Sequence, residues 1–310
     1  MRIVFMGTPD FAVPTLQALA ESKHQVVGVY TQPDREQGRG KKTAYSPVKS
    51  FALSHGIPVF QPKSLKKQER ADEIRALRPD VIIVVAYGVI LRDNILSIPR
   101  YGCINVHASL LPKYRGAAPI QWALLCGEEK TGVTVMQMDA GLDTGDILKT
   151  VEYEIRPKET GESLFDRLSV LGGPALLEVL EEAEAGVLHP IPQGDSPTPY
   201  AKMLDKAMGK LDFTENAEVL ERKVRAFYSW PAAYCFRQGK MLKVRDSETV
   251  YYEGDALPGT VIEVTKKAFT VACGKDALQF LSVQPEGKKW MEADAYLRGY
   301  PVIVGEMLNV

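Results

Sequence analysis

Short apolar runs alternate with segments of helical spacing through the first part of the chain, and this alternation limits the folds that the chain can adopt. The apolar runs lie at residues 2–6, 26–30, 81–85 and 103–107. Helical patterns, such as residues 47–55 and 72–77, separate them. Strands that are apolar along their whole length are buried on both faces, as in a mostly parallel sheet covered by helices. We therefore predict an α/β, Rossmann-like domain over residues 1–189.

Two further patterns complete this domain. Residues 132–138 alternate apolar and polar side chains, a turn follows, and residues 147–155 resemble a returning strand, which predicts a hairpin at the edge of the sheet. A helical pattern then covers residues 162–185. Because proline removes a backbone donor and clashes with the preceding turn, we expect Gly172-Gly173-Pro174 to kink or interrupt this helix.

The composition changes after Gly186, where four prolines stand among Gly194, Asp195 and Ser196. Such a segment does not form regular structure, and we expect a linker over residues 190–205. An amphipathic helix and a series of short strand-like runs follow, at residues 220–227, 233–236, 240–245, 259–264, 269–272 and 277–283. Short strands with frequent turns are typical of a small closed barrel, so we expect an OB-like β-barrel domain over residues 206–310.

The composition excludes several classes of protein. The 310 residues carry a formal net charge of −1, so any nucleic-acid partner must be recognised by local charge. The cysteines, Cys103, Cys126, Cys235 and Cys273, lack C-x-x-C spacing, which argues against a zinc site or a disulfide framework. No apolar run approaches the roughly 20 residues that a membrane-spanning helix needs. We expect a cytoplasmic monomer that needs no metal and binds no membrane.

Asn105 and His107 stand where the fourth apolar run ends. Successive strand residues point to opposite faces, so these two share one face and Val106 points into the other layer. Ligands of open α/β sheets bind beyond the carboxyl ends of the strands. An amide donor beside an imidazole that titrates near neutral pH suits the oxyanion of a tetrahedral acyl-transfer intermediate. Taken alone, such a pair is more often structural.

Two loops add to this pair. Residues 109–112 are unusually apolar for a connection, which fits either a buried turn or a wall for a flat apolar ligand. Residues 138–146 interleave Asp139, Asp143 and Asp146 with glycines, as in a hairpin turn or a cation loop, but without the spacing of a calcium loop. If Asp143 reaches His107, its carboxylate favours the imidazolium and orients the ring. No serine or cysteine is placed as a nucleophile, which favours direct transfer to an external one.

Together these segments resemble the folate-dependent formyltransferases. The resemblance rests on Asn105-x-His107, on the run from Ser109 to Gly116 and on the turn from Gly141 to Gly145, and it extends over nearly the whole chain. It implies transfer of the formyl group of 10-formyltetrahydrofolate to the amino group of methionine carried by initiator tRNA. It also implies that Asn105, His107 and Asp143 are catalytic and that the folate is held by four residues, Ser109, Leu110, Leu111 and Pro112.

A basic loop lies within residues 31–46. It contains Arg39, Lys41 and Lys42 beside glycines, and composition alone favours a solvated surface loop. Flexible basic loops also bind phosphates and become ordered on binding. The resemblance places these three residues at the tRNA, and it implies a tRNA contact for the C-terminal domain by analogy.

Other functions share parts of this pattern. A formyltransferase for a sugar or nucleotide amine would use the same Asn, His and Asp set, and a formyltetrahydrofolate hydrolase would replace the amine by water. A dinucleotide-binding dehydrogenase is disfavoured, because the G-x-G-x-x-G fingerprint is absent from the sequence. A non-catalytic RNA-binding module would leave the Asn105 and His107 pair without a role.

Overall fold

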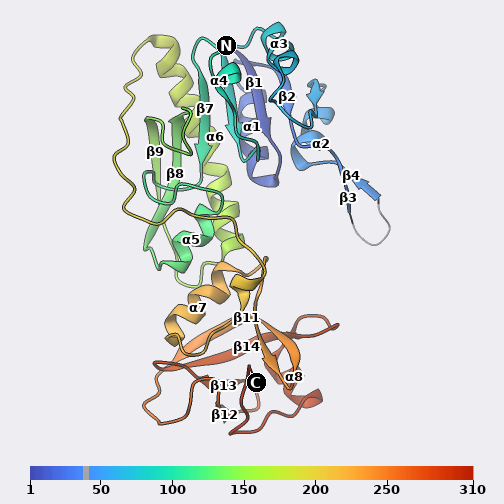
Figure 1. Cartoon of the computed structure of the whole chain (residues 1–310), viewed down its shortest axis with the longest axis vertical. Coiled ribbons are helices and arrows are strands. Elements are labelled where there is room, and N and C mark those ends of the chain that lie inside the picture. The colour runs from blue at the N-terminus through green and yellow to red at the C-terminus, as the bar shows by residue number, and fades with distance from the viewer. Residues whose placement is uncertain (38–41, 310) are drawn as a thin grey trace. The chain divides into compact units, whose positions relative to one another are not determined.

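The computed structural model describes residues 1–37 and 42–309, which form two compact units (Figure 1). The first unit comprises Met1–Pro119, Lys130–Glu154 and Phe165–Ala201. The second comprises Ile120–Glu129, Ile155–Leu164 and Lys202–Val310. The expected domain limits at residues 189 and 206 stay a prediction.

Seven strands of the described chain form the sheet of the first unit, in the order β5-β2-β1-β6-β7-β8-β9. They are β1 (Arg2–Gly7), β2 (Gln25–Tyr30), β5 (Val59–Phe60), β6 (Val81–Val85), β7 (Cys103–His107), β8 (Lys130–Gln137) and β9 (Ile147–Glu154). The strands from β5 to β7 are parallel, whereas β8 and β9 are antiparallel and form the edge hairpin. The Rossmann-like parallel sheet is thereby confirmed. The chain order reverses between β1 and β6, where doubly wound folds bind their ligands.

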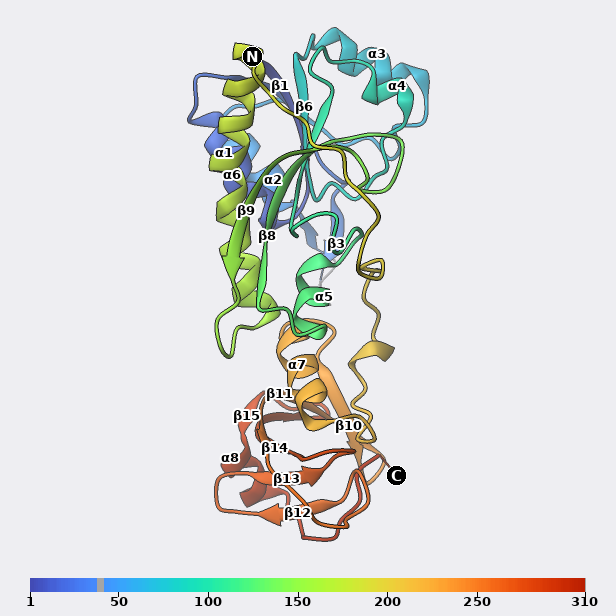
Figure 2. The ribbon, with the colours of Figure 1, turned by 90° about the vertical axis from the view of Figure 1, so that its left-hand side faces the viewer.

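Helices cover both faces of this sheet (Figure 2). On one side, α3 (Gln68–Ala76) and α4 (Asp93–Leu96) pack through Ile74 and Ile95 on a cluster that includes Cys103 of β7. On the other side lie α1 (Val13–Ala20) and the long helix α6 (Gly161–Ala185). The remaining elements before β6 are η1 (Asp10–Ala12), α2 (Pro47–Ser54), β3 (Arg35–Gln37) and β4 (Lys42–Ala44), and α5 (Pro119–Leu125) follows β7.

Helix α6 runs from Gly161 to Ala185 without an interruption at Pro174, so that half of the expectation is wrong, while a kink at this proline stays a prediction. The two glycines before the proline allow close packing: a Cβ on Gly172 would lie 2.6 Å from Cγ1 of Val106, and one on Gly173 would lie 2.8 Å from Cβ of Ala18. Pro174 deprives the carbonyl of Val170 of its helical donor. Val170 is 56% exposed, so water can hydrate that carbonyl. Packing therefore outweighs the local effect of the proline.

The second unit is built on an antiparallel sheet. Its described strands follow the order β10-β11-β14-β13-β12, and β15 pairs with β14. They are β10 (Ala233–Arg237), β11 (Lys240–Val250), β12 (Val261–Val264), β13 (Phe269–Ala272), β14 (Ala277–Pro285) and β15 (Met291–Glu292), and the helices are η2 (Ala207–Gly209), α7 (Ala217–Ala226) and α8 (Ala293–Gly299). Leu220 and Val224 of α7 pack on Phe269 and Phe280 in the core. The described pairings do not join β12 to β10, and a closed OB-like barrel stays a prediction.

Within residues 1–37 and 42–309, no helix combines the length and the apolar character that a bilayer crossing requires.

Candidate active site

His107 ends β7 with its ring held between two loops. Its Nε2 lies 3.1 Å from the carbonyl oxygen of Tyr114, and its Nδ1 lies 3.9 Å from Oδ2 of Asp143. Because a carbonyl oxygen only accepts, Nε2 carries the proton of that hydrogen bond. The longer separation exceeds a direct hydrogen bond but suits attraction between a carboxylate and an imidazolium. The side chain of His107 is only 7% exposed, which weakens the screening of this attraction by water.

Asp143 lies in the turn between β8 and β9, with a left-handed backbone at φ 54°. Its Oδ2 accepts a hydrogen bond of 2.9 Å from the backbone N–H of Gly116, which aims the carboxylate at the loop after β7. Asp139 shapes the same turn by accepting from the Gly141 N–H and the Thr144 hydroxyl. Gly145 is required, since a Cβ there would lie 1.9 Å from the carbonyl oxygen of Gln137.

Asn105 precedes His107 by two residues in β7, so both side chains emerge on one face of the sheet. Val106 between them points to the opposite face, toward Gly172. The Asn105 side chain is partly exposed, and its amide has no hydrogen-bond partner in the described part of the chain. Its N–H groups therefore remain available to a ligand.

The loop of residues 109–112 is a packed turn. Ser109 is fully buried, and its hydroxyl donates to the carbonyl of Lys113 at 2.7 Å. Thr134 of β8 fixes the loop through two hydrogen bonds. Its hydroxyl donates to the Ser109 carbonyl at 2.7 Å and accepts from the Leu111 N–H at 3.0 Å. Leu111 is buried, while Leu110 and Pro112 are half-buried. The side chains of Ser109 and Leu111 thus serve the turn, and a folate role for this loop stays a prediction.

Residues 191–201, called the strap below, run beside these loops. Ile191 exchanges two backbone hydrogen bonds of 2.8 Å with Ile147, at the start of β9. Ala201 bonds to the backbone of residues 115 and 117, and Thr198 accepts from the Tyr114 N–H at 2.8 Å. Sequence reasoning missed these contacts, because a proline-rich segment has no periodicity that would indicate its partners.

The predicted tRNA-binding residues lie in another part of the chain. Arg39 and Lys41 fall outside the described residues, and Lys42 begins β4, which pairs with β3. Their predicted role is therefore untested.

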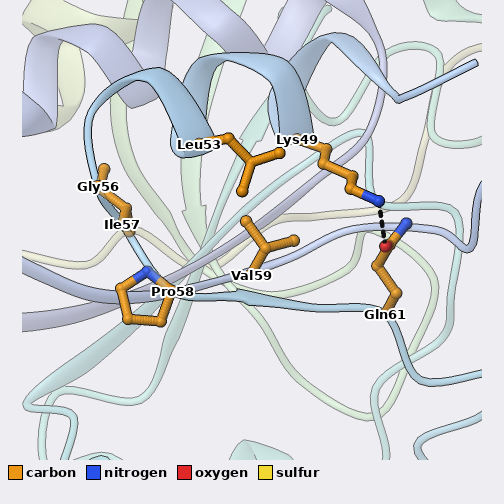
Figure 3. Close-up of a pocket in the computed structure, with 7 residues that line it drawn as sticks. All are labelled: Lys49, Leu53, Gly56, Ile57, Pro58, Val59 and Gln61. Atoms are coloured by element: carbon orange, nitrogen blue, oxygen red, sulfur yellow. Dashed lines mark hydrogen bonds between the residues drawn. The ribbon is translucent and has the colours of Figure 1, made fainter.

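A surface pocket of about 460 Å³ lies between α2 and the edge strand β5 (Figure 3). Lys49 lies at its rim and donates to Oε1 of Gln61 at 2.8 Å and to Oδ2 of Asp34 at 2.5 Å. The hydrogen bond from Lys49 lowers the pKa of Asp34. The pocket contains none of the predicted site residues, and the polar groups of Lys49 and Gln61 are already paired with each other.

The candidate site combines acid, base and amide groups of the protein itself. Among the residues that the structure describes, no three His, Cys, Asp or Glu side chains are grouped to hold a metal ion. A buried imidazole, a facing carboxylate and a free amide can stabilise an oxyanion and move a proton.

Comparison with known proteins shows the family of this chain. Residues 1–180 match the formyl transferase family, and residues 203–301 match the formyl transferase C-terminal domain. The chain belongs to the formyl transferase family. Methionyl-tRNA formyltransferase from Lachnospira eligens is 50% identical over 314 residues, which cover 100% of both chains. The enzyme of that name from Hydrogenovibrio crunogenus is 50% identical over 293 residues, or 94% of each chain.

A solved structure shows the same fold at greater distance. HypX from Aquifex aeolicus, in complex with tetrahydrofolic acid, superposes with a TM-score of 0.62 at 18% sequence identity. The match covers 99% of this chain and 48% of that longer one. The present chain thus spans about half the length of HypX, and the likeness concerns the fold.

Proposed function

We propose that this chain transfers the formyl group of 10-formyltetrahydrofolate to the α-amino group of methionine carried by initiator tRNA, the step that prepares this tRNA for translation initiation. The supporting observation is the approach of Asp143 to His107 at 3.9 Å, with Asn105 two residues before His107 on the same strand and its amide unpaired among the described residues. Support for the acceptor comes from the full-length identity of 50% to the enzyme from Lachnospira eligens.

The reaction forms a bond between the methionine nitrogen and the formyl carbon and breaks the bond between that carbon and N10 of the folate. A free α-amino group has a pKa of about 7.7–8.0, so a usable fraction is neutral and nucleophilic at physiological pH. Asn105 and protonated His107 meet the developing oxyanion, and each contributes on the order of 3 kcal/mol if it acts like an oxyanion-hole donor elsewhere.

Asp143 has two tasks in this scheme. Its negative charge faces the His107 ring and stabilises the positive charge that the ring carries while it donates to the oxyanion. It also accepts the proton of the attacking amine, directly or through water, and a proton then passes to N10 so that the folate leaves as a neutral amine. The hydrogen bond from the Gly116 N–H leaves a lone pair of Oδ2 and the whole of Oδ1 for these tasks.

Ser109, Leu110, Leu111 and Pro112 form the proposed wall for the folate. The half-buried Leu110 and Pro112 offer apolar surface to a flat heterocycle, while Ser109 and Leu111 hold the turn in shape. The donor in this proposal is a co-substrate that leaves after each turnover, and the chemistry needs no metal.

The tRNA contacts are proposed for two places. Arg39, Lys41 and Lys42 supply a basic loop for phosphates, and the antiparallel second unit, as an OB-like barrel, supplies a further surface. We place the enzyme, as a monomer, in the cytoplasm, where reduced cysteines agree with the four free thiols of the chain.

A single assay with alternative acceptors tests the proposal. The full chain is incubated with 10-formyltetrahydrofolate and, in parallel, with methionine-charged initiator tRNA, free methionine, an amino-sugar nucleotide or no acceptor. We expect rapid formylation of the charged tRNA alone. Preferred formylation of the amino sugar, or folate release without any acceptor, would replace the proposal by a sugar formyltransferase or a hydrolase, respectively.

A further inference from the structure

Gln193 of the strap has every hydrogen bond of its side-chain amide directed at the loops of the candidate site. Its Oε1 accepts from Nε and Nη2 of Arg115, at 3.1 and 2.8 Å. Its Nε2 donates to the carbonyl oxygens of Asp143 and Gly145, at 3.1 and 2.6 Å. One side chain thereby joins the loop after β7 to the turn between β8 and β9.

The two donated bonds hold the residue whose carboxylate faces His107. Asp143 has a positive φ of 54°, a conformation that L residues adopt only when their surroundings hold them there. Gln193 binds the carbonyl of Asp143 itself and that of Gly145, two residues further on. With the backbone of the turn held at both points, the direction of the Asp143 side chain toward Gly116 and His107 is held as well.

The strap also supports His107, the residue that faces Asp143. The Thr198 hydroxyl accepts from the N–H of Tyr114, at 2.8 Å, and the carbonyl of the same Tyr114 accepts from Nε2 of His107, at 3.1 Å. Tyr114 is likewise held at a positive φ of 58°. Both partners of the carboxylate–imidazole pair are therefore positioned through a segment far along the chain from either.

We infer that Gln193 is a positioning residue for formyl transfer, which sets the place of the Asp143 carboxylate relative to His107, and that Thr198 does the same for the ring. The inference rests on the proposed function. Neither residue touches the reacting atoms. Asp143 is half-buried, so water can reach its carbonyl when Gln193 is replaced, whereas the carbonyl of the buried Gly145 loses its donor. What changes is geometry, and a misplacement of about 1 Å in an active site costs on the order of 100-fold in rate.

Two substitutions distinguish the acceptor of the Gln193 side chain, Oε1, from its donor, Nε2. Gln193→Glu keeps an acceptor for Arg115 and removes both donors to the turn, whereas Gln193→Ala removes all of these bonds. We expect Gln193→Glu to lower kcat about 10- to 100-fold, with KM for folate and for tRNA changed less than about threefold. Gln193→Ala should lose at least as much. A wild-type kcat in Gln193→Glu, or a loss confined to KM, overturns the inference.

Two matched variants at Thr198 test the inference independently, even if the Gln193 variants do not fold. Thr198→Ser keeps the hydroxyl acceptor and should keep kcat within about twofold, whereas Thr198→Val should lower it about tenfold by leaving the Tyr114 N–H without its acceptor. Equal kcat in the two variants would show that Thr198 does not position the ring.

The wild-type assay distinguishes a failure of this inference from a failure of the proposed function. If the wild-type chain formylates charged tRNA, the variants test the strap directly. If it uses another amine or water as acceptor, the proposed function is wrong, and the same kcat comparison with that acceptor still decides the role of Gln193.

Discussion

Oδ2 of Asp143 lies 3.9 Å from Nδ1 of His107, although one residue follows β8 and the other ends β7. The same Oδ2 is anchored by the backbone N–H of Gly116, a neutral donor. This hydrogen bond keeps the carboxylate aimed at the His107 ring. This relationship can be tested by removing the charge and keeping the hydrogen bond.

Asp143→Asn does so, because the amide oxygen still accepts from Gly116. We expect kcat to fall on the order of 100-fold, since the imidazolium of His107 loses its counter-charge and the amine loses its proton acceptor. The Kd of the folate, measured by fluorescence titration, should stay within about twofold. Asp166→Asn, which removes an exposed carboxylate on α6, serves as the control and should turn over normally. Unchanged turnover in Asp143→Asn would rule out its catalytic role.

Asn105→Ala is expected to separate activity from stability. Loss of one oxyanion donor should lower kcat about 10²- to 10³-fold. The free energy of unfolding in urea should change by less than about 1 kcal/mol, because the Asn105 amide has no partner among the described residues to leave unpaired. A large loss of stability with little loss of turnover would assign this amide to the fold instead.

Arg39→Ala should impair the use of tRNA only. We expect kcat/KM for charged tRNA to fall about tenfold and the salt dependence of binding to weaken, since one phosphate contact is lost. KM for the folate should not change. Lys66→Ala, at an exposed position outside the basic loop, removes a comparable charge and controls for net charge. Equal tRNA kinetics in the two variants would contradict the role of the loop.

Gly172→Ala should destabilise the first unit although alanine is the better helix former. The gain in helix propensity is about 1 kcal/mol, but the new Cβ would lie 2.6 Å from Cγ1 of Val106, and overpacking costs about 1–3 kcal/mol. We expect a net loss of about 1 kcal/mol in urea unfolding. A double-mutant cycle with Val106→Ala should show favourable coupling. Gly299→Ala in α8, where a Cβ meets nothing within 4 Å, should not destabilise.

Thiol reactivity should distinguish Cys126 from the other cysteines. Cys103, Cys235 and Cys273 are buried, and burial raises the pKa of each thiol to about 12, whereas Cys126 is exposed. A raised pKa means that at pH 8 only about one buried thiol in 10⁴ is a thiolate, the reactive form. Iodoacetamide at pH 8 should therefore label Cys126 alone in the folded protein, and all four after unfolding. Rapid native labelling of Cys103 would contradict its place beneath α3 and α4.

The interior of the first unit could be predicted closely because its signals are local. Strands β6 and β7 occupy the predicted residues, since short, largely apolar runs separated by helical patterns are typical of a covered parallel sheet. The same alternation placed Val106 in the layer opposite to Asn105 and His107, and in the structure Val106 lies against Gly172 of α6. Helix α6 shows the limit of local signals. Pro174 does not interrupt it, because Gly172 and Gly173 pack closely against residues that are distant in sequence.

Residue type and strand periodicity were enough to indicate which chemical groups stand at the end of β7 and which kind of sheet carries them, because both signals lie within a few neighbouring positions. The approach of Asp143 to His107, and the hydrogen bonds of Gln193 and Thr198 to the loops that carry this pair, become visible in the folded chain. These contacts join segments whose separation along the chain carries no periodic signal. Their geometry depends on backbone conformations, such as the positive φ of Asp143 and Tyr114, that become favourable only when the surrounding hydrogen bonds exist.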